Sequence, residues 1–188
     1  MNETPVVESK AAKLRQEFDL AFALPPPQAS EEAIDLLMIR VAGDPYAILL
    51  REIGGMVVGR TVVPIPAVTL DLLGLAGIRG GVVPVFGLAS ILGYGGQASG
   101  SPRWMILCGA DEPIALAFSD FEGYLRVPKS SLHIEENPRA ALTTRVGRGG
   151  QYVNQVASTD AGVRAVISIP LVVATIRNRS GRQRSSEQ

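Results

Sequence analysis

Apolar residues along this chain recur in short runs, many of which alternate from one position to the next. The clearest run, 114–118, alternates large and small apolar side chains throughout. Because neighbouring side chains of a strand point to opposite faces, this run predicts a strand with one bulky buried face and one tightly covered face. Similar runs predict further strands at 36–41, 46–50, 56–58, 61–64, 82–86, 104–108, 124–127, 152–157 and 163–169. About ten short strands separated by glycine, proline and aspartate turns favour small closed β-barrels or a sandwich.

Helical patterns are few. Short pieces are predicted at 70–73 and 87–92, and a final helix is predicted to open at Pro170, where proline suits the first turn. Near the N-terminus, Ala11, Leu14 and Phe18 fall at helical spacing before a run of three prolines, which predicts an amphipathic helix. Its apolar stripe either packs on the rest of this protein or docks on a partner. We therefore expect an N-terminal extension with a proline-rich linker at 1–30, one folded domain at 31–178 and a disordered basic tail at 179–188.

Composition indicates a globular chain. Of its 188 residues 46% are hydrophobic and 19% charged, which is enough apolar mass for a real core. The 18 basic residues balance the 18 acidic ones, so no net charge attracts nucleic acid or an anionic membrane. A single cysteine excludes an internal disulfide, no signal peptide is evident, and the apolar run at 165–176 is too short to cross a bilayer. These features predict a soluble cytoplasmic protein.

Residues that could carry catalysis or bind a metal are scarce. The chain has one cysteine, Cys108, and one histidine, His133, so we expect no metal site, cofactor or catalytic group. Cys108 ends an apolar run, which favours a buried and inert thiol. The alternative is a small enzyme in which Cys108 is the nucleophile and His133 the base.

One stretch, 77–85 (GIRGGVVPV), has the character of a binding site. Arg79 stands between glycines, and Gly80 and Gly81 allow a backbone turn and the close approach of another chain. A fixed guanidinium there offers several hydrogen-bond donors to a partner, or it locks this protein's own loop. Pro84 lacks an N–H group, which suits a sheet edge or a bulge rather than a central strand.

A longer pattern surrounds this arginine block. It comprises, in order, Tyr46, Ile48, Ile53, Ile65, Gly74, Ile78-Arg79-Gly80, Val82-Val83-Pro84-Val85 and Leu88. In this order the chain resembles the CheW-like domain of bacterial chemotaxis coupling proteins. The resemblance covers about 34–177, and the arginine–glycine–strand block is its most specific part.

The resemblance implies a mainly β fold of two five-stranded SH3-like β-barrel subdomains, with a short N-terminal amphipathic helix and a short C-terminal helix. It implies a non-enzymatic adaptor without cofactor or metal. The implied partners are the regulatory domain of a CheA-type histidine kinase and methyl-accepting chemoreceptors, with no nucleic acid and no direct membrane insertion. The implied partner-binding residues are Arg79, Gly80, Gly74, Ile53, Gly77 and Met56.

Three positions depart from the family's pattern. Gly55, Gly77 and Gly87 stand where the family usually has a glutamate, an asparagine and an aspartate. Each change removes a polar group, so partner specificity is expected to differ from that of a main-pathway coupling protein. We expect a chemotaxis-type adaptor. The alternatives left open are an adaptor for gliding, pili or a second-messenger pathway, and a β-barrel that binds nucleic acid.

Overall fold

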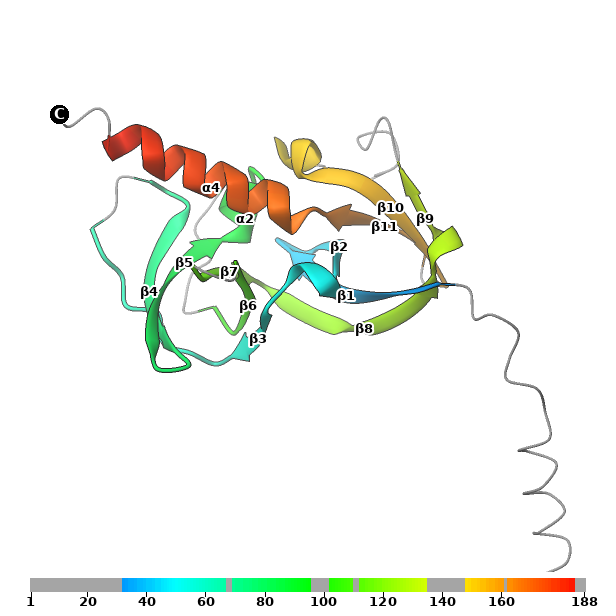
Figure 1. Cartoon of the computed structure of the whole chain (residues 1–188), viewed down its shortest axis with the longest axis horizontal. Coiled ribbons are helices and arrows are strands. Elements are labelled where there is room, and N and C mark those ends of the chain that lie inside the picture. The colour runs from blue at the N-terminus through cyan, green and yellow to red at the C-terminus, as the bar shows by residue number, and fades with distance from the viewer. Residues whose placement is uncertain are drawn as a thin grey trace, which may run out of the picture. The chain divides into compact units, whose positions relative to one another are not determined.

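The computed structural model describes residues 32–66, 69–95, 102–109, 112–134, 148–160 and 162–184. The helix and linker expected at 1–30 lie outside these residues. The described part is mainly β and forms two sheets, which confirms the predicted fold class (Figure 1). Its helical pieces are η1 (Leu50–Glu52), α2 (Leu88–Ile91), η2 (Lys129–Ser131), η3 (Arg148–Tyr152) and α4 (Ile169–Arg184).

Strand order defines the two sheets. The six-stranded sheet has the order β8-β1-β2-β11-β10-β9, and the five-stranded sheet has the order β3-β6-β7-β5-β4. The strands of the six-stranded sheet are β1 (Ala33–Val41), β2 (Asp44–Leu49), β8 (Asp120–Pro128), β9 (Leu132–Ile134), β10 (Val153–Thr159) and β11 (Gly162–Ile167). The strands of the five-stranded sheet are β3 (Gly55–Val58), β4 (Leu72–Ile78), β5 (Gly81–Gly87), β6 (Trp104–Cys108) and β7 (Ile114–Phe118).

Both sheets are built to the same plan. Each contains two antiparallel hairpins, β1–β2 and β10–β11 in one sheet, β6–β7 and β4–β5 in the other. One parallel pair joins the two hairpins of each sheet, β2 with β11 and β5 with β7. The strand predicted at 36–41 and the one predicted at 46–50 form the first of these hairpins, as the apolar pattern indicates.

A bent segment closes each sheet into a barrel. In the five-stranded sheet, β3 pairs with β6 at one edge, and Val63 then bridges to Leu75 of β4 at the other edge. In the six-stranded sheet, β8 pairs with β1, and β9 pairs with β10 at the opposite edge after the short η2 turn. β8 and β9 thus form two halves of one bent strand. Counted in this way, the six strands correspond to the five-stranded barrel that we expected. The strand predicted at 61–64 is reduced to the single bridge at Val63.

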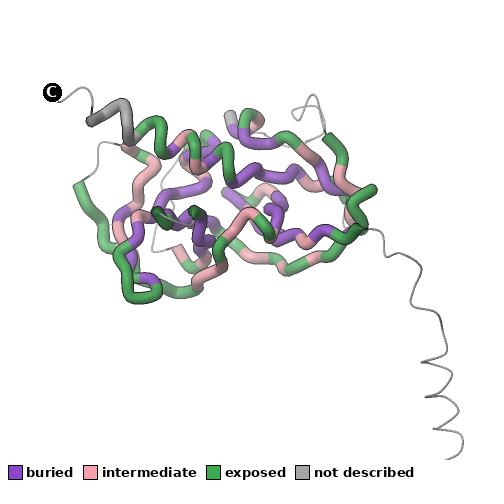
Figure 2. Tube along the Cα trace, in the orientation of Figure 1, coloured by how far each residue is buried: buried purple, intermediate pink, exposed green. Residues whose placement is uncertain are grey.

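Three apolar clusters fill this arrangement, and single strands contribute to two of them at once. In β7, Ile114, Leu116 and Phe118 enter a large central cluster shared by both sheets, while Ala115 and Ala117 face a separate cluster inside the five-stranded barrel. The alternation of large and small residues therefore has the structural meaning predicted from the sequence. The buried segments are concentrated where the strands of the two sheets meet (Figure 2).

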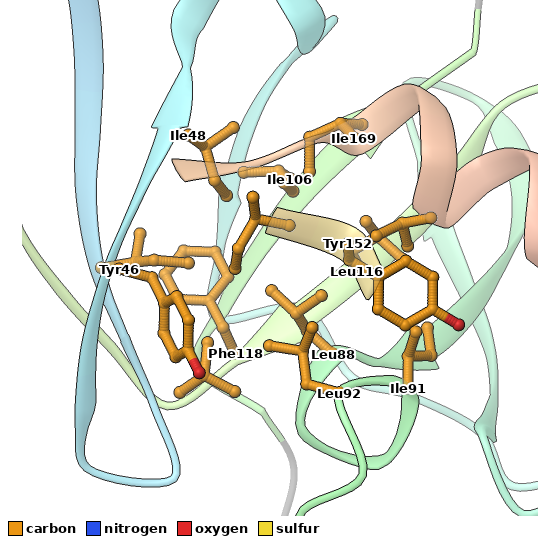
Figure 3. Close-up of a cluster of buried hydrophobic side chains, with 14 of the residues drawn as sticks. Tyr46, Ile48, Leu88, Ile91, Leu92, Ile106, Leu116, Phe118, Tyr152 and Ile169 are labelled. Carbon is orange, nitrogen blue, oxygen red and sulfur yellow. The ribbon is translucent and has the colours of Figure 1, made fainter. Parts of the chain in front are cut away.

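The central cluster joins the two barrels. Tyr46 and Ile48 come from β2, Ile106 from β6, and Ile169 from the start of α4 (Figure 3). Ile48, Ile106 and Ile169 are at most 1% exposed. Burying a large aliphatic side chain contributes about 1.5–3 kcal/mol to stability. Because the cluster takes such side chains from both sheets and from α4, this burial holds the two sheets together.

Pro84 lies inside the five-stranded sheet, between β7 and β4, and not at the edge that the sequence suggests. The β5–β7 ladder begins only at Val85, so Pro84 has no ladder partner on that side. On the other side Pro84 faces Leu75, whose N–H and C=O are both bonded to Val63. A pair of this kind exchanges no ladder hydrogen bond, so a central strand accommodates proline at a position that needs no N–H.

Two helices differ from the prediction: one is absent, and one is longer than expected. The helix expected at 70–73 is absent, because β4 begins at Leu72 and pairs with β5. At the other end, α4 begins as predicted beside Pro170 but runs to Arg184, into the segment expected to be a disordered tail. Packing of Val172 and Ile176 anchors its first turns, and a helix once nucleated extends at little cost.

Candidate functional site

Arg79 and Gly80 form the two-residue turn between β4 and β5, where Ile78 pairs with Gly81. Their φ angles are +50° and +81°, the combination of a type I′ turn. This turn matches the right-handed twist of the flanking strands, but a positive φ is uncommon for a residue with a side chain. The hairpin therefore holds Arg79 at its tip in a conformation that an isolated loop would rarely adopt.

The Arg79 guanidinium folds back toward the beginning of β3. Its Nη2 donates a hydrogen bond of 3.4 Å to the carbonyl of Gly54, and the residue stays exposed. A Cβ placed on Gly55 would lie 2.7 Å from the same Nη2, a distance that real contacts essentially never reach. The sequence resemblance leads us to expect glutamate at this position in the family. The missing side chain makes room for the arginine.

The structure brings most of the expected partner-binding residues to this corner. Gly80 and Gly77 belong to the same hairpin as Arg79. Ile53 and Met56 flank the Gly54-Gly55 pair, and both are partly buried against the central cluster. The contact between Arg79 and Gly54 links the two groups across opposite edges of the sheet. The part these residues play in binding remains a prediction.

Gly74 has a different structural role. It is buried, its φ is +147°, and a Cβ there would lie 2.2 Å from the carbonyl oxygen of Val63. The absence of a side chain at Gly74 lets the segment after β3 approach β4 and close the barrel. This role accounts for the glycine without any partner.

An exposed apolar strip adjoins the Arg79 turn, and sequence reasoning did not identify it. Ladder partners share a face of the sheet, and the pairs Val82–Gly77, Pro84–Leu75 and Leu75–Val63 form one row. Val82 is 73% exposed and Val63 is 60% exposed. Apolar side chains grouped on a surface mark interaction sites more often than isolated ones do. The sequence signal was the alternation in β5, which leaves Val82 on the face opposite the buried Val83.

The candidate catalytic pair is not assembled. Cys108 is fully buried in β6, where burial first and the charge of Glu52 second raise its pKa to about 12. His133 is exposed on β9, in the other sheet. A thiol of this kind is a poor nucleophile near neutral pH. Among the described residues, no group of three acidic, histidine or cysteine side chains is placed to hold a metal ion.

The comparisons with known proteins agree with this geometry. A family model of the CheW-like domain matches residues 35–158. The chain belongs to the CheW-like family. A crystal structure of the scaffolding protein TtCheW from Thermoanaerobacter tengcongensis has the same fold, with a TM-score of 0.58 and 16% identity. That match covers 71% of this chain and 88% of TtCheW. Among curated proteins, none matches the chain.

CheW-like domains are non-enzymatic scaffolds of chemotaxis signalling, so this chain is an adaptor domain and not an enzyme. The buried Cys108 thiol is consistent with that assignment. In the part of the chain that the structure describes, no helix is long and apolar enough to cross a membrane.

Proposed function

We propose that this CheW-like domain couples methyl-accepting chemoreceptors to a CheA-type histidine kinase, and that it acts in the cytoplasm. The observation that carries the proposal is the Arg79 turn, an exposed guanidinium held at a hairpin tip within a domain of this family. A guanidinium offers several donors in a fixed geometry, which favours a partner's carbonyl or carboxylate oxygens. The exposed strip with Val82 and Val63 supplies apolar contact beside it.

The Arg79 turn is suited to binding because little has to be ordered when a partner arrives. The type I′ geometry fixes the backbone, and the Gly54 carbonyl already orients the guanidinium. Preorganisation of this kind reduces the entropic cost of association. A guanidinium carries five N–H donors, so the single contact of 3.4 Å with the Gly54 carbonyl leaves further donors for a partner.

Binding of the kinase regulatory domain tests the proposal. Titration calorimetry compares the wild-type chain with Arg79→Glu, and Arg60→Glu is the matched control because Arg60 is another exposed arginine that follows β3. We expect Arg79→Glu to weaken binding at least about tenfold with unchanged thermal unfolding, because it replaces a donor group with a repelling carboxylate. Arg60→Glu should bind as the wild type does.

Two results would count against the proposal. If the wild-type chain binds neither the kinase regulatory domain nor a receptor signalling fragment, the coupling function is wrong. If the wild-type chain binds and Arg79→Glu binds equally well, the function stands but the site lies elsewhere.

A further inference from the structure

Glu52 lies in η1, the connection that leaves the six-stranded sheet at β2 and enters the five-stranded sheet at β3. Its Oε2 accepts a hydrogen bond of 3.0 Å from the backbone N–H of Ile169, which is 117 residues away in the sequence. Ile169 opens α4, directly after β11 of the six-stranded sheet. This single bond therefore ties the connection between the two sheets to the start of α4.

The N–H of Ile169 depends on Glu52 for a partner. The first N–H groups of a helix have no acceptor within the helix, and Ile169 is only 1% exposed, so water does not replace one. The two neighbouring residues leave no N–H group unsatisfied. The N–H of Ser168 donates to the Tyr152 carbonyl, and Pro170 has no N–H group. An unsatisfied buried donor is costly, which makes the Glu52 oxygen the group that fixes this junction.

The electrostatic surroundings of Glu52 agree with this position. Burial raises the pKa of the Glu52 carboxyl, while the Ile169 N–H and then the nearby Arg51 lower it. The carboxylate also contributes to the raised pKa of Cys108, which places the buried thiol near the same junction. Glu52 is thus a partly buried acceptor with a defined donor and not a solvated surface acid.

A short segment with hydrogen bonds at both of its N–H groups connects Glu52 to the Arg79 turn. The N–H of Ile53 donates to the carbonyl of Leu50 at 3.3 Å, and the N–H of Gly54 donates to the carbonyl of Leu107 at 2.7 Å. The carbonyl of Gly54 then accepts the guanidinium of Arg79. Only one residue separates Glu52 from Gly54, so little slack remains between the α4 junction and the arginine.

We propose that Glu52 is the positioning residue of the Arg79 site: by accepting the Ile169 N–H it holds the 50–55 connection so that the Gly54 carbonyl meets Arg79. The partner-binding part of this inference rests on the proposed function. The structural part does not, because it concerns the order of the 50–55 connection in the free protein. Through this hydrogen bond, the start of α4 helps to fix the position of the Arg79 turn.

Two substitutions of Glu52 separate the charge of the side chain from its hydrogen-bonding oxygen. Glu52→Gln keeps a side-chain oxygen that can accept the Ile169 N–H, whereas Glu52→Ala removes it. Arg179→Ala is the control for a general loosening of α4, because it breaks the ion pair between α4 and Asp71, far along the helix from Ile169. If Glu52 is a positioning residue, Glu52→Gln should keep the amide protection and the binding affinity that Glu52→Ala loses.

Hydrogen exchange of the free protein tests the structural part. We expect Glu52→Ala to raise the amide exchange rates of Gly54 and of residues 78–82, around the Arg79 turn, by about tenfold. This is the effect of losing one buried hydrogen bond. Glu52→Gln and Arg179→Ala should leave these amides near wild-type rates. Equal exchange in Glu52→Ala and wild type would overturn the inference, and so would the same increase in Arg179→Ala.

A double-mutant cycle on binding of the kinase regulatory domain tests the link to Arg79. We expect Glu52→Ala to weaken binding about tenfold alone and to add little in an Arg79→Ala background, because both changes remove the same oriented guanidinium. Full additivity would show that Glu52 does not act through Arg79 and would overturn the link. If the wild-type chain fails to bind, the proposed function is wrong, and the exchange experiment still decides the role of Glu52.

Discussion

Arg79 occupies the space that a side chain at Gly55 would need. A Cβ on Gly55 would lie 2.7 Å from Nη2 of Arg79, and the neighbouring Gly54 carbonyl accepts the same nitrogen. The two residues sit at opposite edges of the five-stranded sheet, and the arginine spans them where the barrel closes. The glycine at position 55 is therefore coupled to the position of the guanidinium.

The first prediction concerns Gly55→Ala, with Gly123→Ala as its matched control. In the ladders, Gly55 pairs with Leu107 and Gly123 with Met38, and their φ angles are +144° and +157°. A Cβ on Gly123 meets nothing within 4 Å. Both variants should lose about 1–3 kcal/mol in urea unfolding through backbone strain. Only Gly55→Ala should also weaken binding of the kinase regulatory domain, and equal affinities for the two variants would contradict the coupling.

The second prediction concerns barrel closure at Gly74. Gly74→Ala places a Cβ 2.2 Å from the Val63 carbonyl oxygen at a φ of +147°, so the Val63–Leu75 bridge must move. We expect a loss of about 3 kcal/mol or more in the free energy of unfolding. Gly77→Ala on the same strand has open space and should stay within about 0.5 kcal/mol of wild type. Similar urea midpoints for the two variants would refute the closure role.

The third prediction uses the buried thiol. Because burial raises the pKa of Cys108 from 9.0 to about 12, alkylation by iodoacetamide at pH 8 should be slow in the folded protein and fast in urea. The unfolded chain loses this proton first as pH rises, so stability should fall between about pH 9 and 12, by at most about 1.4 kcal/mol per pH unit. Cys108→Ala should flatten the fall between pH 9 and 10, below the titration of the tyrosines. If the stability of Cys108→Ala falls with pH as steeply as that of the wild type, the fall is not caused by the Cys108 thiol.

The fourth prediction concerns a hydrogen-bond chain beside the central cluster. The Tyr94 hydroxyl donates to Asp44 at 2.6 Å and lies 2.6 Å from the Tyr46 hydroxyl, and Tyr46 is only 2% exposed. Tyr94→Phe leaves the Tyr46 hydroxyl without its partner and should cost about 1–3 kcal/mol in thermal or urea unfolding. Tyr124→Phe, which removes an exposed hydroxyl bonded to Asp35, should cost much less. A comparable loss in both variants would mean that burial of the pair is unimportant.

Much of the fold follows from local patterns. The alternation in 114–118 predicts both faces of β7, and the glycines at 80 and 81 predict a backbone turn beside Arg79. The structure places the turn one residue earlier, at Arg79 and Gly80, and Gly81 already belongs to β5. These features depend on φ and on side-chain direction, which neighbouring residues decide. Errors arose where local signals are ambiguous. The leucines at 70–73 suit either a helix or a strand, and only pairing with β5 places Leu72 and Leu73 in a strand.

The candidate site was predictable in part. The sequence indicates Arg79 and its glycines, because a cation between small residues is a local feature. It could not indicate the role of Gly74 in admitting Val63, nor the row of exposed residues around Val82, because each requires the strand register. Glu52 carries no local signal at all, since its partner is 117 residues away.

The sequence by itself determined that the chain forms short strands and that its arginine is flanked by glycines, since composition and spacing along the chain decide these. Tertiary structure alone decided that the Arg79 guanidinium meets Gly54, that β8 and β9 close one barrel, and that Glu52 joins η1 to α4. The physical reason is that contacts between distant segments are selected by shared burial and by the need to satisfy every buried N–H, and no stretch of neighbouring residues encodes those conditions.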